Sequence, residues 1–136
     1  MAASDFDPGR AGPIRSTHLP PRPESVPAAR HFASDAASEM GAKRSVTDTE
    51  LLVSELATNA VLHARTPMRV SVLLHDDRVR VEVRDDDPTL PEQRQPDPLS
   101  PGGRGIMLVE LLARAWGINH NERGKTVWFE LEEPTD

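Results

Sequence analysis

The chain has 136 residues and no cysteine, which suits a single domain and excludes disulfides, thiolate zinc sites and cysteine nucleophiles. Its formal net charge of -6 removes the electrostatic basis for binding nucleic acid or an anionic membrane, although a local pocket can still hold a small anion. No apolar run approaches the length of a membrane span and the N-terminus lacks a signal-peptide pattern, so we expect a soluble cytoplasmic protein.

The prolines fall into two clusters. Of the 13 prolines, six lie within residues 1–27 and five lie between Pro88 and Pro101. Because proline resists helices and central strands, both segments are expected to be irregular. The start of the chain is also poor in large apolar side chains, so residues 1–19 are predicted to be a disordered or loosely attached arm, followed by a folded domain over residues 20–133. The second cluster is predicted to be a loop inside that domain.

Two helices are predicted between the proline clusters. The alanine-rich residues 25–40 suit a helix that begins at a serine cap and ends before a glycine. Residues 47–64 suit a second helix, because leucine and alanine recur on one face of it. Its start carries Thr47 and Glu50 at the spacing of a capping box.

The second half of the domain is predicted to be mostly strand. Residues 68–75 and 78–84 alternate apolar and polar side chains around an acidic turn, which is typical of a β-hairpin with one buried face. After the proline-rich loop, residues 105–116 suit a third helix, residues 117–120 a short strand and residues 126–131 a last strand. This order predicts an α+β fold, a two-layer α/β sandwich with a mixed, mostly antiparallel sheet, helices on one face and a polar, wet outer face.

The second helix carries the first candidate site. Glu55 and Asn59 are four residues apart, so they share a helix face at the margin of its apolar side. A carboxylate in that position can act as a base, and an amide oxygen can bind a hard cation. A solvated glutamate beside a surface asparagine is the commoner use of the same residues.

Two further candidate sites flank the proline-rich loop. The run Asp85–Asp87 follows a strand, where a buried acid can accept a hydrogen bond from an amine such as that of adenine, although a polar turn is the commoner use. Gly103, Arg104 and Gly105 lead directly into the third helix. Glycine permits close backbone approach, and the N–H groups of a first helical turn offer an anion site that Arg104 would strengthen. A plain helix entry explains the glycines equally well.

The order of these three sites resembles that of the histidine-kinase-like (GHKL, Bergerat-fold) ATPases. Residues 50–64 (ELLVSELATNAVLHA) look like the N-box helix of that family, and residues 83–87 (VRDDD) stand in the place of its adenine box. Residues 103–110 (GRGIMLVE) look like its phosphate box, and residues 124–129 (GKTVWF) resemble its closing strand. The resemblance runs over residues 19–131. In its short form without a sensor domain, the chain is similar to the anti-sigma-factor serine kinases of actinobacteria.

The resemblance implies ATP and Mg²⁺ as cofactors and a protein serine kinase as the activity. Asn59 would ligate the Mg²⁺ that bridges the ATP phosphates. Glu55 would be the catalytic residue, a general base toward a serine hydroxyl or a water. Such chemistry works mainly by positioning and charge neutralisation.

The remaining nucleotide contacts are implied in the same way. Asp85 would accept a hydrogen bond from the adenine amino group, with support from Thr126 on the last strand. Gly103 and Gly105 would let the backbone wrap the phosphates, and Arg104 would neutralise part of their charge.

One feature departs from the family pattern. The adenine box is usually Asp-x-Gly-x-Gly, whereas here Asp87 and Thr89 stand at the glycine positions, after an extra acid, Asp86. Losing the glycines removes a close backbone approach, and Asp87 adds negative charge near a polyphosphate. This predicts a low affinity for ATP. The prolines from Pro88 to Pro101 would then lie in the lid over the nucleotide.

The leading hypothesis is therefore an ATP-binding anti-sigma regulatory protein with serine kinase activity toward an anti-anti-sigma partner. Its expected partners are ATP or ADP, a sigma factor and an anti-anti-sigma protein, with neither nucleic acid nor membrane, and the family often forms homodimers. The runner-up is a non-catalytic module that sequesters a sigma factor or another regulator, with weak nucleotide binding or none. A catalytically silent α+β domain is the third alternative.

Overall fold

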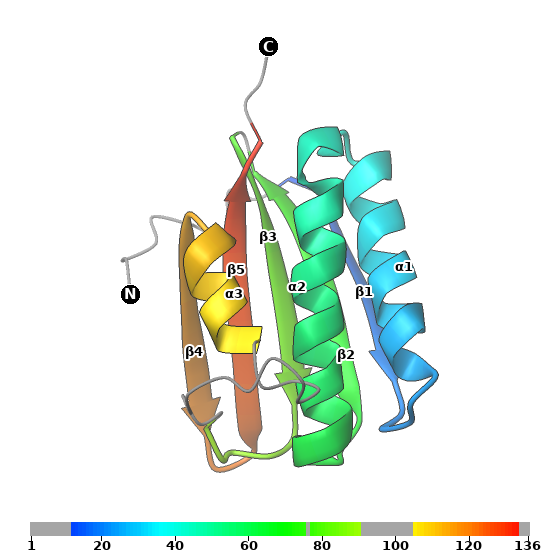
Figure 1. Ribbon diagram of the computed structural model, residues 1–136, viewed down its shortest axis with the longest axis vertical. Coiled ribbons are helices and arrows are strands. Elements are labelled where there is room, and N and C mark those ends of the chain that lie inside the picture. The colour runs from blue at the N-terminus through cyan, green and yellow to red at the C-terminus, as the bar shows by residue number, and fades with distance from the viewer. Residues whose placement is uncertain (1–11, 76, 91–104, 134–136) are drawn as a thin grey trace.

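The computed structural model describes residues 12–75, 77–90 and 105–133. Within them the chain forms a sheet of five strands with helices packed on it (Figure 1). In chain order the elements are β1 (Ile14–Leu19), α1 (Ser25–Glu39), η2 (Lys43–Ser45), α2 (Val46–Asn59), η3 (Ala60–Ala64), β2 (Met68–His75), β3 (Arg78–Asp85), α3 (Gly105–Leu112), β4 (Ala115–Asn121) and β5 (Gly124–Glu132).

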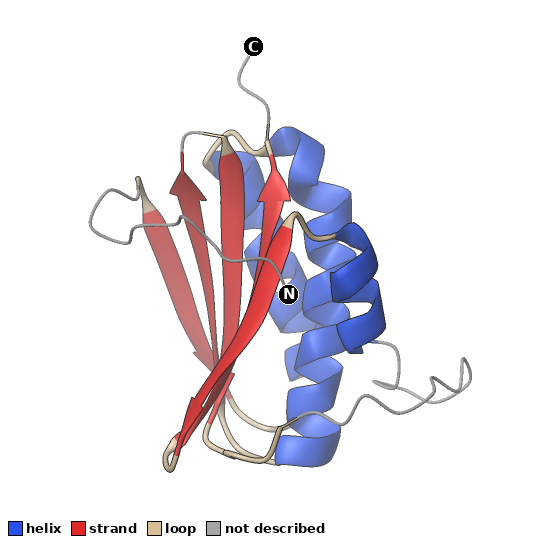
Figure 2. Cartoon of the chain, turned by 90° about the vertical axis from the view of Figure 1, so that its left-hand side faces the viewer, coloured by secondary structure: helices blue, strands red, loops and turns tan. Residues whose placement is uncertain are grey.

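The strands lie in the order β1-β2-β3-β5-β4, and every neighbouring pair is antiparallel. Helices α1, α2 and α3 lie on one face of the sheet (Figure 2). The predicted α+β class and two-layer sandwich are confirmed, and the described strands pair without the parallel contact that a mixed sheet would contain. Among the described residues, no helix combines the length and the apolar character needed to cross a bilayer.

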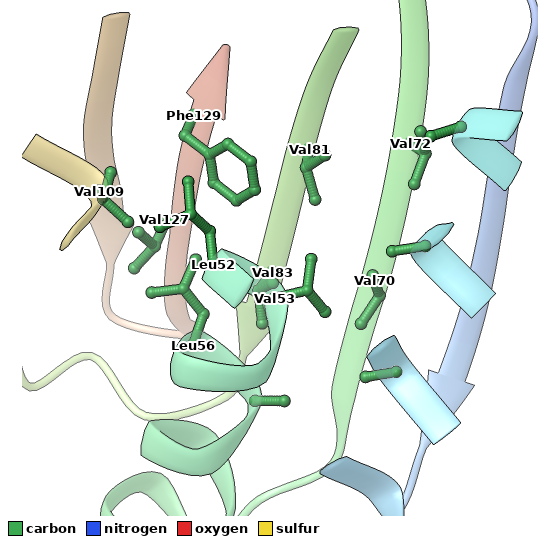
Figure 3. Close-up of a cluster of buried hydrophobic side chains, with 14 of the residues drawn as sticks. Leu52, Val53, Leu56, Val70, Val72, Val81, Val83, Val109, Val127 and Phe129 are labelled. Carbon is green, nitrogen blue, oxygen red and sulfur yellow. The ribbon is translucent and has the colours of Figure 1, made fainter. Parts of the chain in front are cut away.

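The core lies between the helices and the inner face of the sheet (Figure 3). Because side chains alternate between the faces of a strand, every second residue of β2, β3 and β5 points at the helices. These inward residues and the apolar face of α2 are almost wholly buried: Leu52, Val53, Leu56, Val70, Val72, Val81, Val83, Val127 and Phe129. Burying one such side chain contributes roughly 1.5–3 kcal/mol.

The start of α2 differs from the prediction. The capping box of Thr47 and Glu50 is not formed, and the N-cap residue Ser45 makes no side-chain hydrogen bond to the helix. Glu50 instead accepts a hydrogen bond from Ser34 Oγ at 2.8 Å, which joins α2 to α1. The Ser45 hydroxyl donates to Glu133 Oε2 at 2.7 Å. Tertiary hydrogen bonds have therefore replaced the local cap.

The third helix is shorter than predicted. It ends at Leu112, and Trp116, predicted to be helical, belongs to β4. Strand β4 begins next to a backbone hydrogen bond from Arg114 N–H to the carbonyl of Glu130, at 2.8 Å. The short strand predicted at residues 117–120 is therefore present but starts earlier. The apolar residues that suggested a longer helix belong to two elements.

Strand β1 lies within residues 1–19, the predicted arm. Residues 14–19 pair with β2, from Ile14 opposite Leu73 to Leu19 opposite Met68. Most β1 side chains are exposed, so the apolar alternation that marks a half-buried strand is missing. This part of the predicted disordered or loosely attached arm is therefore an ordered edge strand, and residues 1–11 lie outside the described residues.

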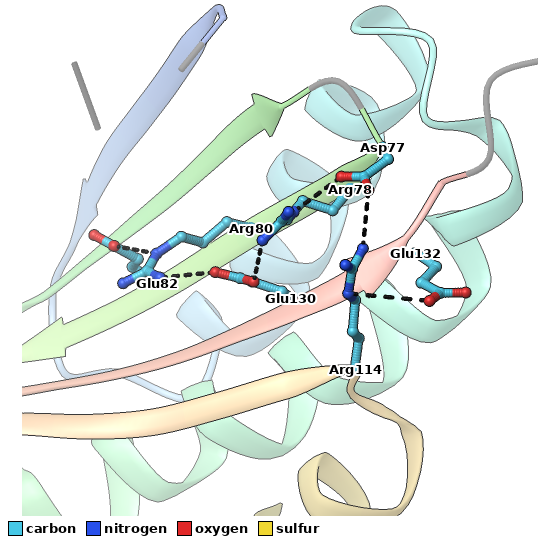
Figure 4. Close-up of polar contacts among 7 residues, drawn as sticks. All are labelled: Asp77, Arg78, Arg80, Glu82, Arg114, Glu130 and Glu132. Carbon is cyan, nitrogen blue, oxygen red and sulfur yellow. Dashed lines mark hydrogen bonds and ion pairs between the residues drawn. The ribbon is translucent and has the colours of Figure 1, made fainter. Parts of the chain in front are cut away.

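The outer face of the sheet is polar, as predicted, but its centre is not wet. Glu130 is 0% exposed, and its carboxylate accepts hydrogen bonds from Arg78 at 3.1 Å and from Arg80 at 2.9 Å (Figure 4). Arg80 also bonds Glu82 at 2.8 Å, and its guanidinium lies 4.2 Å from the centre of the Trp128 ring. The register of β3 and β5 places these charged side chains on one face of the sheet, where they form hydrogen bonds and ion pairs with one another.

Candidate functional site

Glu55 and Asn59 lie in the last part of α2, the central helix of the layer (Figure 1). Glu55 is 7% exposed, which excludes a solvated glutamate, and Asn59 is half-buried. The helix changes immediately after Asn59 into the π-helical turn η3, which ends at Arg65 in the left-handed conformation, with a φ of 58°. Such π turns often occur at functional sites.

The first residue of α3, Gly105, lies beside both of these side chains. A Cβ built on Gly105 would lie 2.8 Å from Asn59 Nδ2 and 3.6 Å from Glu55 Cβ. Only glycine permits the helix to begin this close to Asn59 without displacing it. The structure thus brings Glu55, Asn59 and Gly105 together. Gly103 and Arg104, predicted to contact phosphates, lie outside the described residues.

Asp85 is the last residue of β3 and is 5% exposed. Lys125, directly opposite on β5, donates from Nζ to Asp85 Oδ1 at 3.0 Å. The same carboxylate oxygen accepts from the backbone N–H of Asp87 at 2.9 Å, and Lys125 Nζ also donates to the Asp87 carbonyl at 3.0 Å. Asp85 is therefore held in a buried ion pair at the end of the sheet.

Lys125 is a site residue that the sequence-based prediction missed. Thr126, predicted to support Asp85, is paired instead with Arg84. Adjacent residues of a strand point to opposite faces, so Thr126 shares the outer face with Trp128, while Lys125 shares the inner face with Val127. Counting back in twos from Val127 identifies Lys125, and that signal was available in the sequence.

Two backbone contacts fix the end of β3. A Cβ on Gly124, where φ is 150°, would collide with the carbonyl oxygen of Asp85 and lie 2.9 Å from the Cα of Asp86. Glycine therefore lets β5 begin beside the end of β3. The Asp86 N–H donates to Thr66 Oγ1 at 2.9 Å, which ties this turn to the segment after η3.

The turn after β3 also lowers the pKa of Asp87. Its carboxylate accepts a hydrogen bond from the backbone N–H of Thr89 at 2.9 Å. That bond, a further one from the Thr89 side chain and the nearby charge of Lys125 lower the pKa of Asp87. Asp87 is therefore ionised at neutral pH, beside a cation that offsets part of its charge.

The chemistry available at the site follows from these groups. A buried carboxylate can take a proton, and a half-buried amide oxygen can contribute to a cation. Within the described ranges, no group of three or more metal-binding side chains could hold an ion by itself. A cation at Asn59 would need most of its ligands from a bound molecule, as Mg²⁺ commonly does with phosphates.

Comparisons with known proteins add a family and a shared fold. Residues 19–131 match the model of the family described as histidine kinase-like ATPase domain. Thirteen solved chains match, among them the crystal structure of the RsbU and RsbW domains of Rv1364c from Mycobacterium tuberculosis, with a TM-score of 0.69 at 21% identity. The match covers 92% of this chain but 34% of the solved one, so this chain spans about a third of its length. No curated protein matches significantly.

Proposed function

The chain belongs to the histidine kinase-like ATPase domain family, and from that premise we propose that it is an ATP-binding anti-sigma regulatory protein with serine kinase activity toward an anti-anti-sigma partner. The observation that carries the proposal is the contact of Gly105 with Asn59 and Glu55, which joins the two helices that carry the predicted catalytic and phosphate groups. Two likenesses support the choice: the sequence resembles the anti-sigma-factor serine kinases, and the fold is that of a solved chain containing an RsbW domain.

The described residues fit a nucleotide at two points that lie near the same end of the sheet. Asp85 Oδ1 is engaged by Lys125 and Asp87, and within the described part of the chain nothing donates to Oδ2, which can accept from an adenine amino group. At the second point, the missing side chain of Gly105 lets the first turn of α3 begin directly beside Asn59. Gly103 and Arg104, outside the described residues, are proposed to extend that phosphate contact.

Asn59 would hold the Mg²⁺ of the nucleotide through its amide oxygen. When bound, the ion would neutralise phosphate charge and so favour phosphoryl transfer. Glu55, one helical turn earlier, is proposed to take the proton from the serine hydroxyl of the partner. Its position supports that role, because Glu55 lies one turn from Asn59 and beside the first residue of α3.

A kinase assay tests the catalytic proposal. The chain is incubated with labelled ATP, Mg²⁺ and candidate anti-anti-sigma proteins, and serine phosphorylation is measured for wild type and for Glu55→Gln, which keeps the shape of the side chain. Glu39→Gln, an exposed glutamate on α1, is the matched control. We expect Glu55→Gln to lose at least about a hundredfold in rate. Equal rates for wild type and Glu55→Gln would exclude Glu55 as the base.

A second function is favoured by the turn after β3. Lys125 already engages Asp85, and Asp87 and Thr89 replace the family glycines. The chain would then sequester a sigma factor or another regulator and bind nucleotide weakly or not at all. Calorimetry with ATP and ADP separates the two: absence of binding at millimolar nucleotide with Mg²⁺ leaves only the sequestering role.

A further inference from the structure

Lys125 and Asp85 together present a hydrogen-bond donor and an acceptor side by side. An ammonium has three N–H donors, and Lys125 uses one on Asp85 Oδ1 and one on the Asp87 carbonyl, both at 3.0 Å. The third N–H has no partner among the described residues. Asp85 Oδ2 is likewise without a donor there. One donor and one acceptor therefore remain on a single buried pair.

The position of Lys125 calls for an explanation beyond folding. The other inward residues of β5 are apolar, namely Val127, Phe129 and Leu131. A buried ion pair adds little net stability compared with apolar side chains of similar size, so the core does not require it. The turn around Asp85 is also fixed by other contacts, through Gly124 and through the hydrogen bond of Asp86 to Thr66.

The chemistry of the pair bears on which purine can bind. A carboxylate alone accepts hydrogen bonds only, so it suits the amino group of a 6-aminopurine and repels the carbonyl of a 6-oxopurine. With an ammonium beside it, the carbonyl of a 6-oxopurine can accept from Lys125 while its ring N–H donates to Asp85. A 6-aminopurine can donate its amino hydrogen to Asp85 and accept from Lys125 at the adjacent ring nitrogen. Donor and acceptor stand in opposite order on the two edges, so the pair complements both of them when the base turns over between the two binding modes.

We propose that Lys125 is the specificity-determining residue of the base site and that it widens recognition from adenine nucleotides to guanine-type, 6-oxopurine nucleotides. This inference rests on the proposed nucleotide site. In a site this shielded from water, with Asp85 5% and Lys125 7% exposed, an unmatched carbonyl oxygen is strongly disfavoured. Without the Lys125 donor, the carbonyl of a 6-oxopurine would face an acceptor-only carboxylate that repels it, whereas the amino group of a 6-aminopurine would still donate to Asp85. Removing the donor should therefore weaken binding of a 6-oxopurine more than binding of a 6-aminopurine.

The test is calorimetric titration of the 136-residue chain with ATP and with GTP, each with Mg²⁺. We expect the two wild-type dissociation constants to agree within about tenfold. Lys125→Met keeps the apolar stem without the donors, and it should weaken GTP binding at least about tenfold more than ATP binding. Lys125→Gln keeps N–H donors and should restore much of the GTP binding. Lys43→Met, at the only other lysine and exposed, is the matched control.

The outcomes separate this inference from the function on which it rests. ATP binding with GTP at least about a hundredfold weaker in wild type would overturn it while leaving the ATP site intact, and this comparison stands even if Lys125→Met fails to fold. Equal weakening of ATP and GTP in a folded Lys125→Met would also overturn it. Binding of neither nucleotide by wild type would overturn the nucleotide site itself, and the inference with it.

Discussion

Gly105 and Asn59 meet where α3 begins: a Cβ on Gly105 would lie 2.8 Å from Asn59 Nδ2. The contact joins two segments that are far apart in the sequence, one on each side of the proline-rich loop. It places the first turn of α3, whose N–H groups have no partner within the helix itself, beside the amide proposed to hold a cation. The negative phosphates and the positive metal ion of a bound nucleotide would thus find their protein ligands side by side.

Gly105→Ala should disturb the packing of the start of α3 against Asn59 without unfolding the protein. The new methyl group must displace the Asn59 side chain, while alanine itself favours the helix. We expect the ATP dissociation constant to rise by about tenfold, with a small change in melting temperature, measured by calorimetry and thermal denaturation. Leu111→Ala, at a 71% exposed position of the same helix, is the control. An unchanged dissociation constant would show that the contact does not shape the site.

Asn59→Ala should remove the magnesium dependence of nucleotide binding. The variant loses the amide oxygen proposed as the ligand and leaves the helix intact, because alanine is the best helix former. Titrating ATP with and without Mg²⁺ should give two different affinities for wild type and nearly equal ones for the variant. Thr58→Ala, the preceding half-buried residue, should behave as wild type. A variant that kept the full magnesium effect would refute the role of Asn59.

Glu130 should be essential for stability although it lies on the outer face. It is wholly buried between Arg78 and Arg80, so Glu130→Ala removes the carboxylate that both guanidinium groups share. We expect the free energy of unfolding to fall by roughly 3–5 kcal/mol in urea denaturation. Glu132→Ala on the same strand, with a 66% exposed side chain, should change it by less than about 1 kcal/mol. Similar losses for both variants would argue against a buried network.

Asp77 should make stability depend on acid pH. Hydrogen bonds from Arg78 and Arg114 lower the pKa of Asp77 in the folded state. A lowered folded pKa stabilises the protein above the unfolded pKa of about 3.9, and the stabilisation disappears as pH falls through the folded value. The stability difference between wild type and Asp77→Asn, measured by urea denaturation, should be constant above about pH 5 and shrink below about pH 4. A constant difference down to pH 2 would contradict this.

Most of the fold can be predicted from the local periodicity of apolar residues in the sequence. The alternating valines of residues 68–84 determine the central hairpin, because burial on one face leaves a period of two. Strand β1 was missed because an exposed edge strand needs no apolar face. Trp116 was misassigned because the apolar residues of α3 and β4 follow one another without an obvious break. The outer network of Arg78 and Glu130 depends on register between strands 52 residues apart, which no local pattern reveals.

The candidate site also has one part that can be predicted from the sequence and one that cannot. Glu55, Asn59 and Asp85 follow from the order of motifs, because each stands in a segment with a characteristic pattern of its own. The family resemblance implies Thr126 as the support of Asp85, yet the alternation of side chains along β5 assigns the inner position to Lys125. The approach of Gly105 to Asn59 depends on how α3 packs on α2, and a sequence does not state that distance.

Binding of ATP to wild type and to Asp85→Asn tests the central claim most directly. The claim is that the chain holds a nucleotide between the end of β3 and the start of α3. Calorimetric titration with Mg²⁺ should give saturable binding to wild type and at least about tenfold weaker binding to Asp85→Asn, with both proteins folded by circular dichroism. No binding to wild type at millimolar ATP, or equal binding to both proteins, would contradict the claim.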